Sequence, residues 1–395
     1  MQVAGVICEY NPFHLGHGAM LQELRRQGMD AIVCCMSGNF VQRGEWAIAR
    51  KFARAEMALR CGADLVLELP TPWSAATAEV FARGGAGALH QTGVVTHLAF
   101  GSECGDAGKI RRTARALDTP EYETALRRLL AGGATFAACR QQAAEELVGA
   151  DAEVLGRPND NLAVEYCRAL DWLGSGMKPL AVRRVGAGHD AGVENGIASA
   201  SHIRRLLYEG SWEEALGLMP PEAAAVLRRE LDCGAAPVSP EHCSRGVLDR
   251  LQRLTEEDLV AYDGGGEGLY HRFYRAVRSS CDLEELLQKA KTKRYTLARL
   301  RRLLLAAYLD LPSDPLPRSL PYLRLLGAND RGRQLLRQME GVPVLTKAAD
   351  VSRLGPAAEE LLKAEARRTD LYRLAFPKLS CDCWDAEWRD SPVLL

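Results

Sequence analysis

The sequence lacks the features that would indicate a membrane span, a secretory route or a strongly charged partner-binding surface. No apolar run approaches the roughly 18 residues that a membrane-spanning helix needs. The opening segment MQVAGVI is too short for a secretory signal and has no basic start, so we expect a cytoplasmic protein without a membrane partner. The formal net charge is −1, so any site for a polyanion must be a local patch.

The twelve cysteines follow no regular spacing. Without a secretion signal, such scattered cysteines indicate reduced thiols rather than a disulfide framework. None of them forms a convincing set of metal ligands with a nearby histidine, so we expect no metal site held by the protein alone.

The chain does contain a regular alternation of apolar runs and helix-like segments in its first half. Its 395 residues, 47% hydrophobic and 26% charged, are typical of a globular protein with two or three domains. Strands that alternate with helices predict an α/β fold with a parallel sheet covered on both faces. The turns at Glu9–Gly18, Ser37–Gly44 and Gly101–Gly105 would then share the carboxyl edge of the sheet, where such folds bind ligands.

The second half has a different composition. From about residue 213 the chain is rich in Leu, Ala, Arg and Glu and has few strand-like runs, which predicts a mainly helical domain. The segment LDCGAAPVSP at 231–240 is typical of a joint. We therefore divide the chain into a nucleotide-binding catalytic domain, 1–230, and a helical, partly basic domain, 231–395.

The stretch CEYNPFHLGHGAM places His14 and His17 on either side of Gly16, where a helix should begin. A strand that turns into a helix presents free backbone N–H groups to an anion, and Gly16 permits close approach. The imidazoles can donate hydrogen bonds to phosphate oxygens as charge develops on them, which suits attack on the α-phosphate of ATP. A plain turn with half-exposed histidines and a zinc-binding pair are the alternatives.

The motif NPFHLGH resembles the phosphate-binding motif of the HIGH-motif nucleotidyltransferase superfamily, which includes adenylyltransferases and class I aminoacyl-tRNA synthetases. The resemblance implies a Rossmann-like fold and chemistry at the α-phosphate of ATP. The segment IASASHIRR is similar to the superfamily's second, serine-containing motif. Ser199, Ser201 and the following helix start would hold the β- and γ-phosphates, with Arg204 as the countercharge. Alone, this segment also fits a simple capped helix.

The chain as a whole resembles the bacterial tRNA(Met) cytidine acetate ligases. The resemblance implies ATP, acetate and elongator tRNA(Met) as substrates, and N4-acetylation of the wobble cytidine through acetyl-adenylate. Asn11 departs from the Asp that many adenylyltransferases have before the motif's proline, and it fits the acetate ligase pattern. The matching blocks are GVICEYNPFHLGH, MSGNFVQRGE, ARAEMALRCGADLVLELP, FGSE, RPND, RRVGAGHD, SASHIR, KTKRYTLARLRRLLL, YLRLLGAND and PVLTK.

The resemblance also implies which residues bind ATP. His14 and His17 would contact the phosphates as catalytic residues, Gly101 and Asn159 would lie against the adenosine, and Arg184, with Arg183 as a less certain neighbour, would contact the nucleotide. Asn159 could instead cap a helix, and the two arginines could be a solvated strand end. The ATP-binding span comprises Ile7, Cys8, Glu9, Tyr10, Asn11, Pro12, Phe13, His14, Leu15, Gly16, His17, Gly18, Ala19 and Met20.

Arg43 follows a turn on the predicted active edge. Its guanidinium could hold the acetate carboxylate or the pyrophosphate in a bidentate pair, or Arg43 could be an ordinary loop residue. We expect small apolar residues around the acetate, because a larger acid must be excluded by size.

A local basic patch is the candidate RNA site. Residues 272–302 contain ten Lys or Arg and three acids, a local charge of +7. The alternative is a solvated helix face. Tyr295 lies in the middle and could stack on an unpaired base. The candidate tRNA-binding residues are Lys291, Lys293, Arg294, Tyr295, Arg299 and Arg302.

The mechanism that this interpretation predicts needs no protein nucleophile. Acetate attacks the α-phosphate, pyrophosphate leaves with help from the histidines and Mg²⁺, and the cytidine amine attacks the mixed anhydride. Three rivals stay open: an adenylyltransferase for a phosphorylated metabolite, a nucleotide-dependent RNA-binding protein without chemistry, and a ligase for another acyl donor. None of these interpretations involves DNA.

Overall fold

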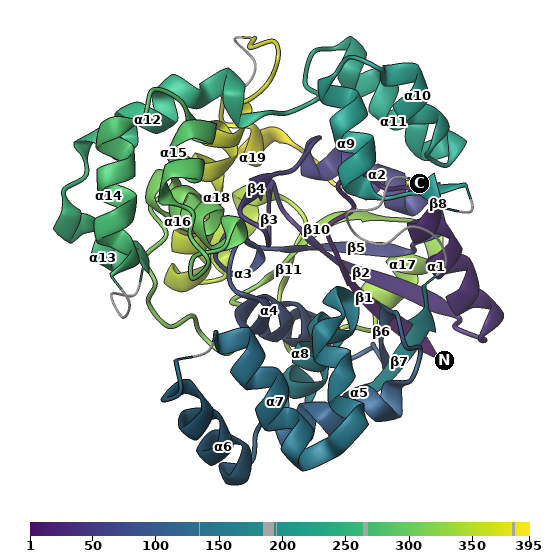
Figure 1. The fold of residues 1–395 in the computed structure, drawn as a ribbon. Coiled ribbons are helices and arrows are strands. Elements are labelled where there is room, and N and C mark those ends of the chain that lie inside the picture. Colours follow the sequence, from purple (N-terminus) through teal and green to yellow (C-terminus); the bar gives the residue numbers. More distant parts are fainter. Residues whose placement is uncertain (134, 185–192, 195, 264–267, 381–383) are drawn as a thin grey trace.

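The computed structural model of the chain describes residues 1–133, 135–184, 193–194, 196–263, 268–380 and 384–395. Its centre is an eight-stranded sheet in the order β11-β10-β5-β2-β1-β6-β7, with β12 paired to β10 (Figure 1). Its strands are β1 (Val3–Cys8), β2 (Ala31–Ser37), β5 (Leu65–Leu69), β6 (His97–Ser102), β7 (Lys178–Arg183), β10 (Leu323–Ala328), β11 (Val344–Leu345) and β12 (Val393–Leu394). The short hairpins are β3 (Phe40–Val41) with β4 (Glu45–Trp46) and β8 (Val193–Glu194) with β9 (Ile197–Ala198).

The helices follow the strands in alternation and then form a long helical run. None of the described helices is long and apolar enough to cross a membrane. They are α1 (Leu15–Arg26), α2 (Lys51–Arg60), α3 (Thr71–Ser74), α4 (Ala78–Gln91), α5 (Ala107–Ala116), α6 (Pro120–Leu130), α7 (Phe136–Val148), α8 (Pro158–Leu173), α9 (Ala200–Tyr208), α10 (Trp212–Gly217), α11 (Pro221–Asp232), α12 (Ser244–Arg253), α13 (Glu256–Asp263), α14 (Leu269–Ser279), α15 (Leu283–Ala290), α16 (Leu297–Leu309), α17 (Asp330–Leu336), α18 (Pro356–Arg373) and α19 (Ala386–Arg389), with 3₁₀ turns at Gly149–Gly156, Pro240–Cys243 and Ala348–Arg353.

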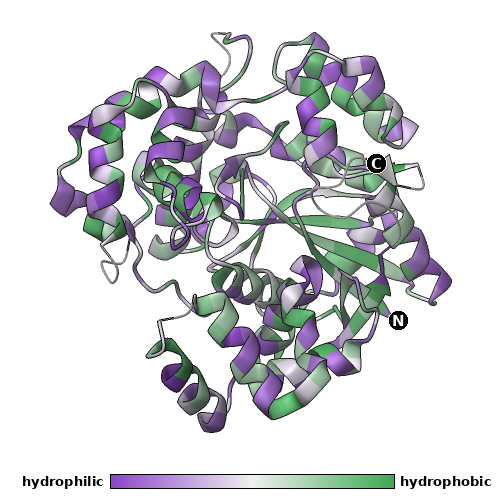
Figure 2. Ribbon diagram, in the orientation of Figure 1, coloured by the Kyte–Doolittle hydropathy of each residue, from purple (hydrophilic) through white to green (hydrophobic). Residues whose placement is uncertain are grey.

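Five adjacent strands, β5, β2, β1, β6 and β7, are parallel. Side chains alternate between two hydrophobic layers: Val3 and Ile7 of β1 pack with one layer that includes α4 and α8, whereas Ala4 and Val6 pack with another that includes α1 and α2. Figure 2 shows the strands as the most uniformly hydrophobic elements. The predicted α/β class and the shared carboxyl edge of β1, β2 and β6 are therefore confirmed.

Helices α12–α16 gather on one side of the molecule and form a hydrophobic cluster of their own (Figure 1). Phe40 and Trp46 of the β3–β4 hairpin and Tyr372 of α18 belong to the same cluster, so the helical part is anchored to the catalytic edge. The C-terminal part is mainly helical, as predicted, but β10, β11 and β12 return to the main sheet. A cut between residues 230 and 231 therefore does not separate all strands from the helical part, and the two-domain division stays a prediction about roles.

Candidate active site

A cavity of about 420 Å³ opens at the carboxyl edge of the sheet. Both sequence motifs, the β3–β4 hairpin and the start of α8 contribute to its wall. Of the predicted site residues, it brings together Ile7, Cys8, Glu9, Tyr10, Asn11, His14, His17, Met20, Arg43, Gly101, Asn159, Arg184, Ser199 and Arg204. Other predicted residues lie outside its lining: Pro12, Phe13, Leu15, Gly16, Gly18, Ala19, Arg183 and Ser201.

His14 and His17 form a reciprocal cap at the start of α1. The Gly16 backbone N–H donates to His14 Nδ1 at 3.0 Å, and the His14 backbone N–H donates to His17 Nδ1 at 3.2 Å. The two rings stack with their centroids 3.7 Å apart. A Cβ on Gly16 would lie 2.9 Å from His14 Cε1, so glycine is required for this ring position. The spacing of the motif is thus explained by a cap built from two imidazoles.

Burial sets the charge of the two rings, and the cap contacts set their tautomer. Burial and the Arg184 positive charge lower the pKa of His14 to about 3, and burial, His14 and Arg184 lower the pKa of His17 well below its usual value. Both imidazoles are therefore neutral near pH 7. Since each Nδ1 accepts a hydrogen bond, each ring carries its proton on Nε2. The pair supplies two N–H donors without a buried positive charge.

Aromatic packing holds the histidine pair in place. Tyr10 and Phe13 are buried, and their ring centroids lie 4.9 and 5.4 Å from that of His17. Arg54, also buried, donates to the backbone carbonyls of Glu9, Ser37 and Gly38 and so joins the ends of β1 and β2. These contacts restrain the edge on which the donors are mounted.

Arg204 joins the second motif to the first. Its guanidinium donates to the Asn11 carbonyl at 2.9 Å and pairs with Glu45 at 3.2 Å. Ser199 caps α9 by accepting from the His202 N–H at 3.2 Å, and the Ser199 and Ser201 hydroxyls lie 3.0 Å apart. The capped helix start is confirmed, whereas phosphate binding by this segment stays a prediction. Ser199 does face it, whereas Ser201 lines a neighbouring cavity.

Asn159 is oriented by the FGSE segment. Its side-chain amide donates to Glu103 Oε1 at 2.6 Å, and its backbone N–H donates to the same oxygen at 3.1 Å. A carboxylate only accepts, so the Asn159 Oδ1 atom is left to accept from a ligand. Asn159 lies inside α8, whose N-cap is Arg157, so the expectation that it caps the helix is wrong. Gly101 lies beside Arg184: a Cβ there would be 3.2 Å from Arg184 Cγ.

One cation on the cavity wall suits an anion. In the described part of the chain, no hydrogen bond or ion pair engages the Arg43 guanidinium. Asn11 is 3% exposed, and its Oδ1 accepts from the Ile48 N–H at 2.6 Å. Its Nδ2 is buried and has no partner among the described residues. Arg183 is exposed at the end of β7, and residues 185–190 of the RRVGAGHD block lie outside the described residues.

Sequence reasoning missed part of the cavity wall. Phe81, Phe100 and Tyr166 give it an apolar side, and only the fold brings these distant residues together. The sequence also did not reveal that Glu45 pairs with Arg204 and Arg301, although Glu45 lies in the block MSGNFVQRGE. The predicted small apolar boundary for acetate stays a prediction.

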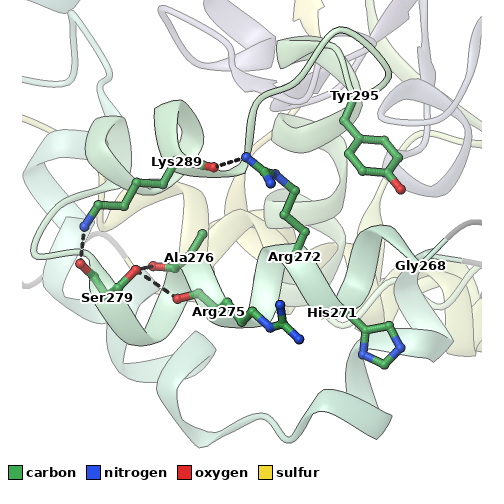
Figure 3. A pocket seen from close by; sticks show the side chains of 8 residues that line it. All are labelled: Gly268, His271, Arg272, Arg275, Ala276, Ser279, Lys289 and Tyr295. Carbon is green, nitrogen blue, oxygen red and sulfur yellow. Dashed lines mark hydrogen bonds between the residues drawn. The ribbon is translucent and has the colours of Figure 1, made fainter.

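The basic patch forms a second candidate site in the helical part. A cavity of about 450 Å³ is lined by residues of α14 and α15 together with Tyr295: Gly268, His271, Arg272, Arg275, Ala276, Ser279, Lys289 and Tyr295 (Figure 3). Arg272 donates to the Ala290 carbonyl at 2.7 Å and is held across the C-terminus of α15. Figure 3 shows the Arg275 side chain without a drawn hydrogen bond to the other residues of this cavity. Arg272, Arg275 and Lys289 thus belong to the basic patch, although they are not among the six candidate tRNA-binding residues chosen from the sequence.

The predicted tRNA-binding residues differ in accessibility. Lys291, Lys293 and Arg294 are exposed, whereas Arg299 and Arg302 are half-buried. Tyr295 is 7% exposed, packs in the helical core, and has the Arg299 guanidinium 5.4 Å from its ring centroid. It therefore lines the basic cavity rather than offering an open ring, so its stacking on a base stays a prediction.

Comparisons with known proteins agree with this geometry. A family model described as HIGH Nucleotidyl Transferase matches residues 1–384. The chain is 34% identical to the tRNA(Met) cytidine acetate ligase of Syntrophomonas wolfei subsp. wolfei, covering 100% of this chain and 99% of that protein. It is 38% identical to the protein of the same name from Caldicellulosiruptor saccharolyticus, with 95% and 94% covered.

Two solved structures have the same fold. The apo crystal structure of Thermotoga maritima TmcAL superposes with a TM-score of 0.94 at 32% identity, covering 100% of both chains. The structure of the same protein bound with alpha-thio ATP superposes with a TM-score of 0.92 at 32% identity, again covering 100% of both chains.

Proposed function

The chain belongs to the HIGH nucleotidyl transferase family, among its tRNA(Met) cytidine acetate ligases, and we propose that it acetylates the wobble cytidine of elongator tRNA(Met) with acetate and ATP. The observation that carries the proposal is the pair of neutral, stacked histidines at the carboxyl edge of β1. Both histidines line the cavity that Arg43 also borders, and their Nε2–H groups are the donors they can offer to it. The alpha-thio ATP in the Thermotoga maritima structure supports ATP as the ligand.

In the first step, an acetate oxygen forms a bond to the α-phosphorus of ATP. The bond from that phosphorus to the bridging oxygen breaks, and pyrophosphate leaves with the electron pair. His14 and His17 donate to oxygens on which negative charge grows, and a neutral donor avoids the cost of burying an imidazolium before ATP arrives. Ser199, the start of α9 and Arg43 line this cavity and would hold the departing phosphates.

Mg²⁺ would act here as a partner of the ATP phosphates rather than as an ion held by the protein alone. Among the described residues, Glu45 is paired with Arg204 and Arg301, whereas no ion pair engages the Glu9 carboxylate. Mg²⁺ commonly binds one or two carboxylates together with substrate phosphates, so Glu9 would hold it. The bound ion would supply positive charge beside the leaving pyrophosphate. Burial raises the pKa of Glu9, whereas the Gln42 N–H and the charges of Arg204 and Arg43 act in the opposite direction.

In the second step, the N4 amine forms a bond to the acetyl carbonyl carbon. The bond from that carbon to the AMP oxygen breaks, AMP leaves with the electron pair, and one amine proton passes to water. The amine is a weak nucleophile, so activation of the acetyl group as an adenylate carries the step. The exposed cations of the basic patch would hold the RNA backbone.

One experiment tests this function against its rivals. The protein is incubated with ATP, labelled acetate and bulk tRNA, and label in the RNA is measured. We expect label only when ATP and acetate are both present, and the modified nucleoside to be N4-acetylcytidine. An adenylyltransferase would instead release pyrophosphate with a metabolite phosphate and without acetate. A binding protein would shift tRNA in a gel and label nothing. Either result would replace the proposal.

A further inference from the structure

A second cavity, of about 480 Å³, lies beside the ATP cavity. The β3–β4 hairpin and α9 form one side of it, and α15 and α16 of the helical part form the other. Glu45 and Arg204 line both cavities. The Glu45 carboxylate pairs with Arg204 at 3.2 Å and with Arg301 of α16 at 2.5 Å. The ATP cavity and the helical part therefore meet at one shared polar wall.

The second cavity is lined by two aromatic side chains, Tyr208 and Trp46, and by charged side chains that include Glu45. The Tyr208 side chain is 48% exposed, and its hydroxyl donates to the Val238 carbonyl at 3.0 Å, which fixes the ring while leaving surface open. Trp46 is 4% exposed, and its indole N–H has no acceptor in the described part of the chain. The exposed Tyr208 ring, the Trp46 side chain and the Glu45 carboxylate therefore all border the second cavity.

We infer that this second cavity receives the target cytosine base, splayed out of the tRNA loop, with its ring on Tyr208. Enzymes that modify a base extrude it into a pocket and recognise it by stacking and by its Watson–Crick edge. The N4 amine of cytosine is a donor and suits the Glu45 carboxylate, while the face of the base suits the exposed Tyr208 ring. Because Glu45 borders both cavities, an amine bound to it lies at the boundary with the ATP cavity, on the side from which it can approach the acetyl group.

The inference rests on the proposed function and adds to it the place of the acceptor base. On this proposal, the ATP cavity would form the adenylate, and the helices of the basic patch would hold the RNA. A backbone held by the cations of α14–α16 would still have to deliver one base to the edge of the sheet, and the second cavity lies between those regions.

The test uses a pair of variants at Tyr208 and a pair of hairpin RNAs. Tyr208→Ala removes the ring, and Tyr208→Phe keeps it while removing the hydroxyl. One RNA carries the anticodon loop with its wobble cytidine, and the other has an abasic nucleotide at that position. Binding constants are measured for wild type and both variants, after thermal unfolding has shown that each is folded; Tyr208 is half-exposed, so Tyr208→Ala should be.

For the cytidine RNA, we expect Tyr208→Ala to weaken binding roughly 5- to 150-fold, the range of a lost base–aromatic stack. For the abasic RNA, binding should be the same for wild type and Tyr208→Ala within twofold. Tyr208→Phe should match wild type with both RNAs. Equal weakening of both RNAs by Tyr208→Ala, or no weakening of either, would overturn the inference. These binding constants need no acetylation, so the inference and the proposed function can fail separately.

Discussion

Removing His17 tests the phosphate role of the histidine pair most directly. His17→Ala deletes the Nε2–H donor that His17 can offer to the cavity and also deletes the Nδ1 atom that accepts from the His14 backbone N–H at 3.2 Å. Two substitutions separate these functions. In His17→Asn, the Oδ1 atom takes the place of Nδ1 and can restore the cap. In His17→Gln, the side-chain amide reaches about as far as Nε2 and can restore the donor.

The magnitude follows from the two contacts. Loss of one donor to a developing oxyanion costs about 10²- to 10³-fold in rate, equivalent to about 2.7–4 kcal/mol. Loss of a helix cap costs about 0.5–2 kcal/mol of the free energy of unfolding. Because His17 is buried and neutral, its removal leaves no unpaired charge, but it also removes a ring that packs against His14, Tyr10 and Phe13. Truncation of a large buried side chain to Ala costs about 2–5 kcal/mol of stability, so the rate loss is to be compared among variants that are shown to be folded.

The assay is acetate-dependent exchange of labelled pyrophosphate into ATP, measured without RNA beside thermal unfolding. We expect His17→Ala and His17→Asn to lose about a hundredfold or more in exchange rate, with His17→Asn nearer to wild type in stability. His17→Gln should recover part of the rate. Exchange at the wild-type rate in folded His17→Asn would show that the Nε2–H donor has no role in adenylate formation, and the argument would be wrong.

The remaining predictions concern charge. His14 has a lowered pKa of about 3 when folded and an ordinary value near 6.5 when unfolded, so its contribution to stability is present above pH 6.5 and is lost as the pH falls toward 3. Relative to His14→Asn, which keeps a cap acceptor and cannot titrate, wild type should lose about 2 kcal/mol of unfolding free energy between pH 7 and pH 5 in urea titrations; parallel curves would refute this. Lys291→Ala with Lys293→Ala should lower the salt dependence of tRNA binding by about 0.7–0.9 for each lost phosphate contact and leave pyrophosphate exchange intact, whereas an unchanged slope would identify a solvated face.

The first motif of the site was predictable because neighbouring residues in the sequence determine its strand, turn and helix cap. An apolar run followed by Asn-Pro, Gly and two histidines specifies a strand, a turn and a capped helix within 24 residues, from Val3 to Arg26. Parallel strands then bring their carboxyl ends to one edge whatever their order. That is why the predictions for residues 9–18, 37–44 and 101–105 hold without any knowledge of strand order.

The return of the chain to the sheet could not be predicted in the same way. Strand β10 has the sequence LRLLGA, and all six residues are buried. A strand buried on both faces shows no alternation, so in a leucine-rich region it cannot be told from a helix by its pattern. Its partner, β5, ends more than 250 residues earlier and runs antiparallel to it. Only tertiary pairing distinguishes the two structures.

The hairpin block MSGNFVQRGE borders two cavities at once. Gly44 has a φ of +75°, and a Cβ there would lie 2.4 Å from the Arg302 backbone nitrogen, so the hairpin fits directly against α16. Arg43 then faces the ATP cavity, while Glu45 binds Arg204 on one side and Arg301 on the other. Sequence reasoning assigned this block only to the anion because it could not see that α16 lies behind it. The close approach of Gly44 makes the position of the helical part depend on the same short loop that carries a phosphate-binding candidate. A substitution at Gly44 should therefore disturb the packing of α16 as well as the loop that carries Arg43.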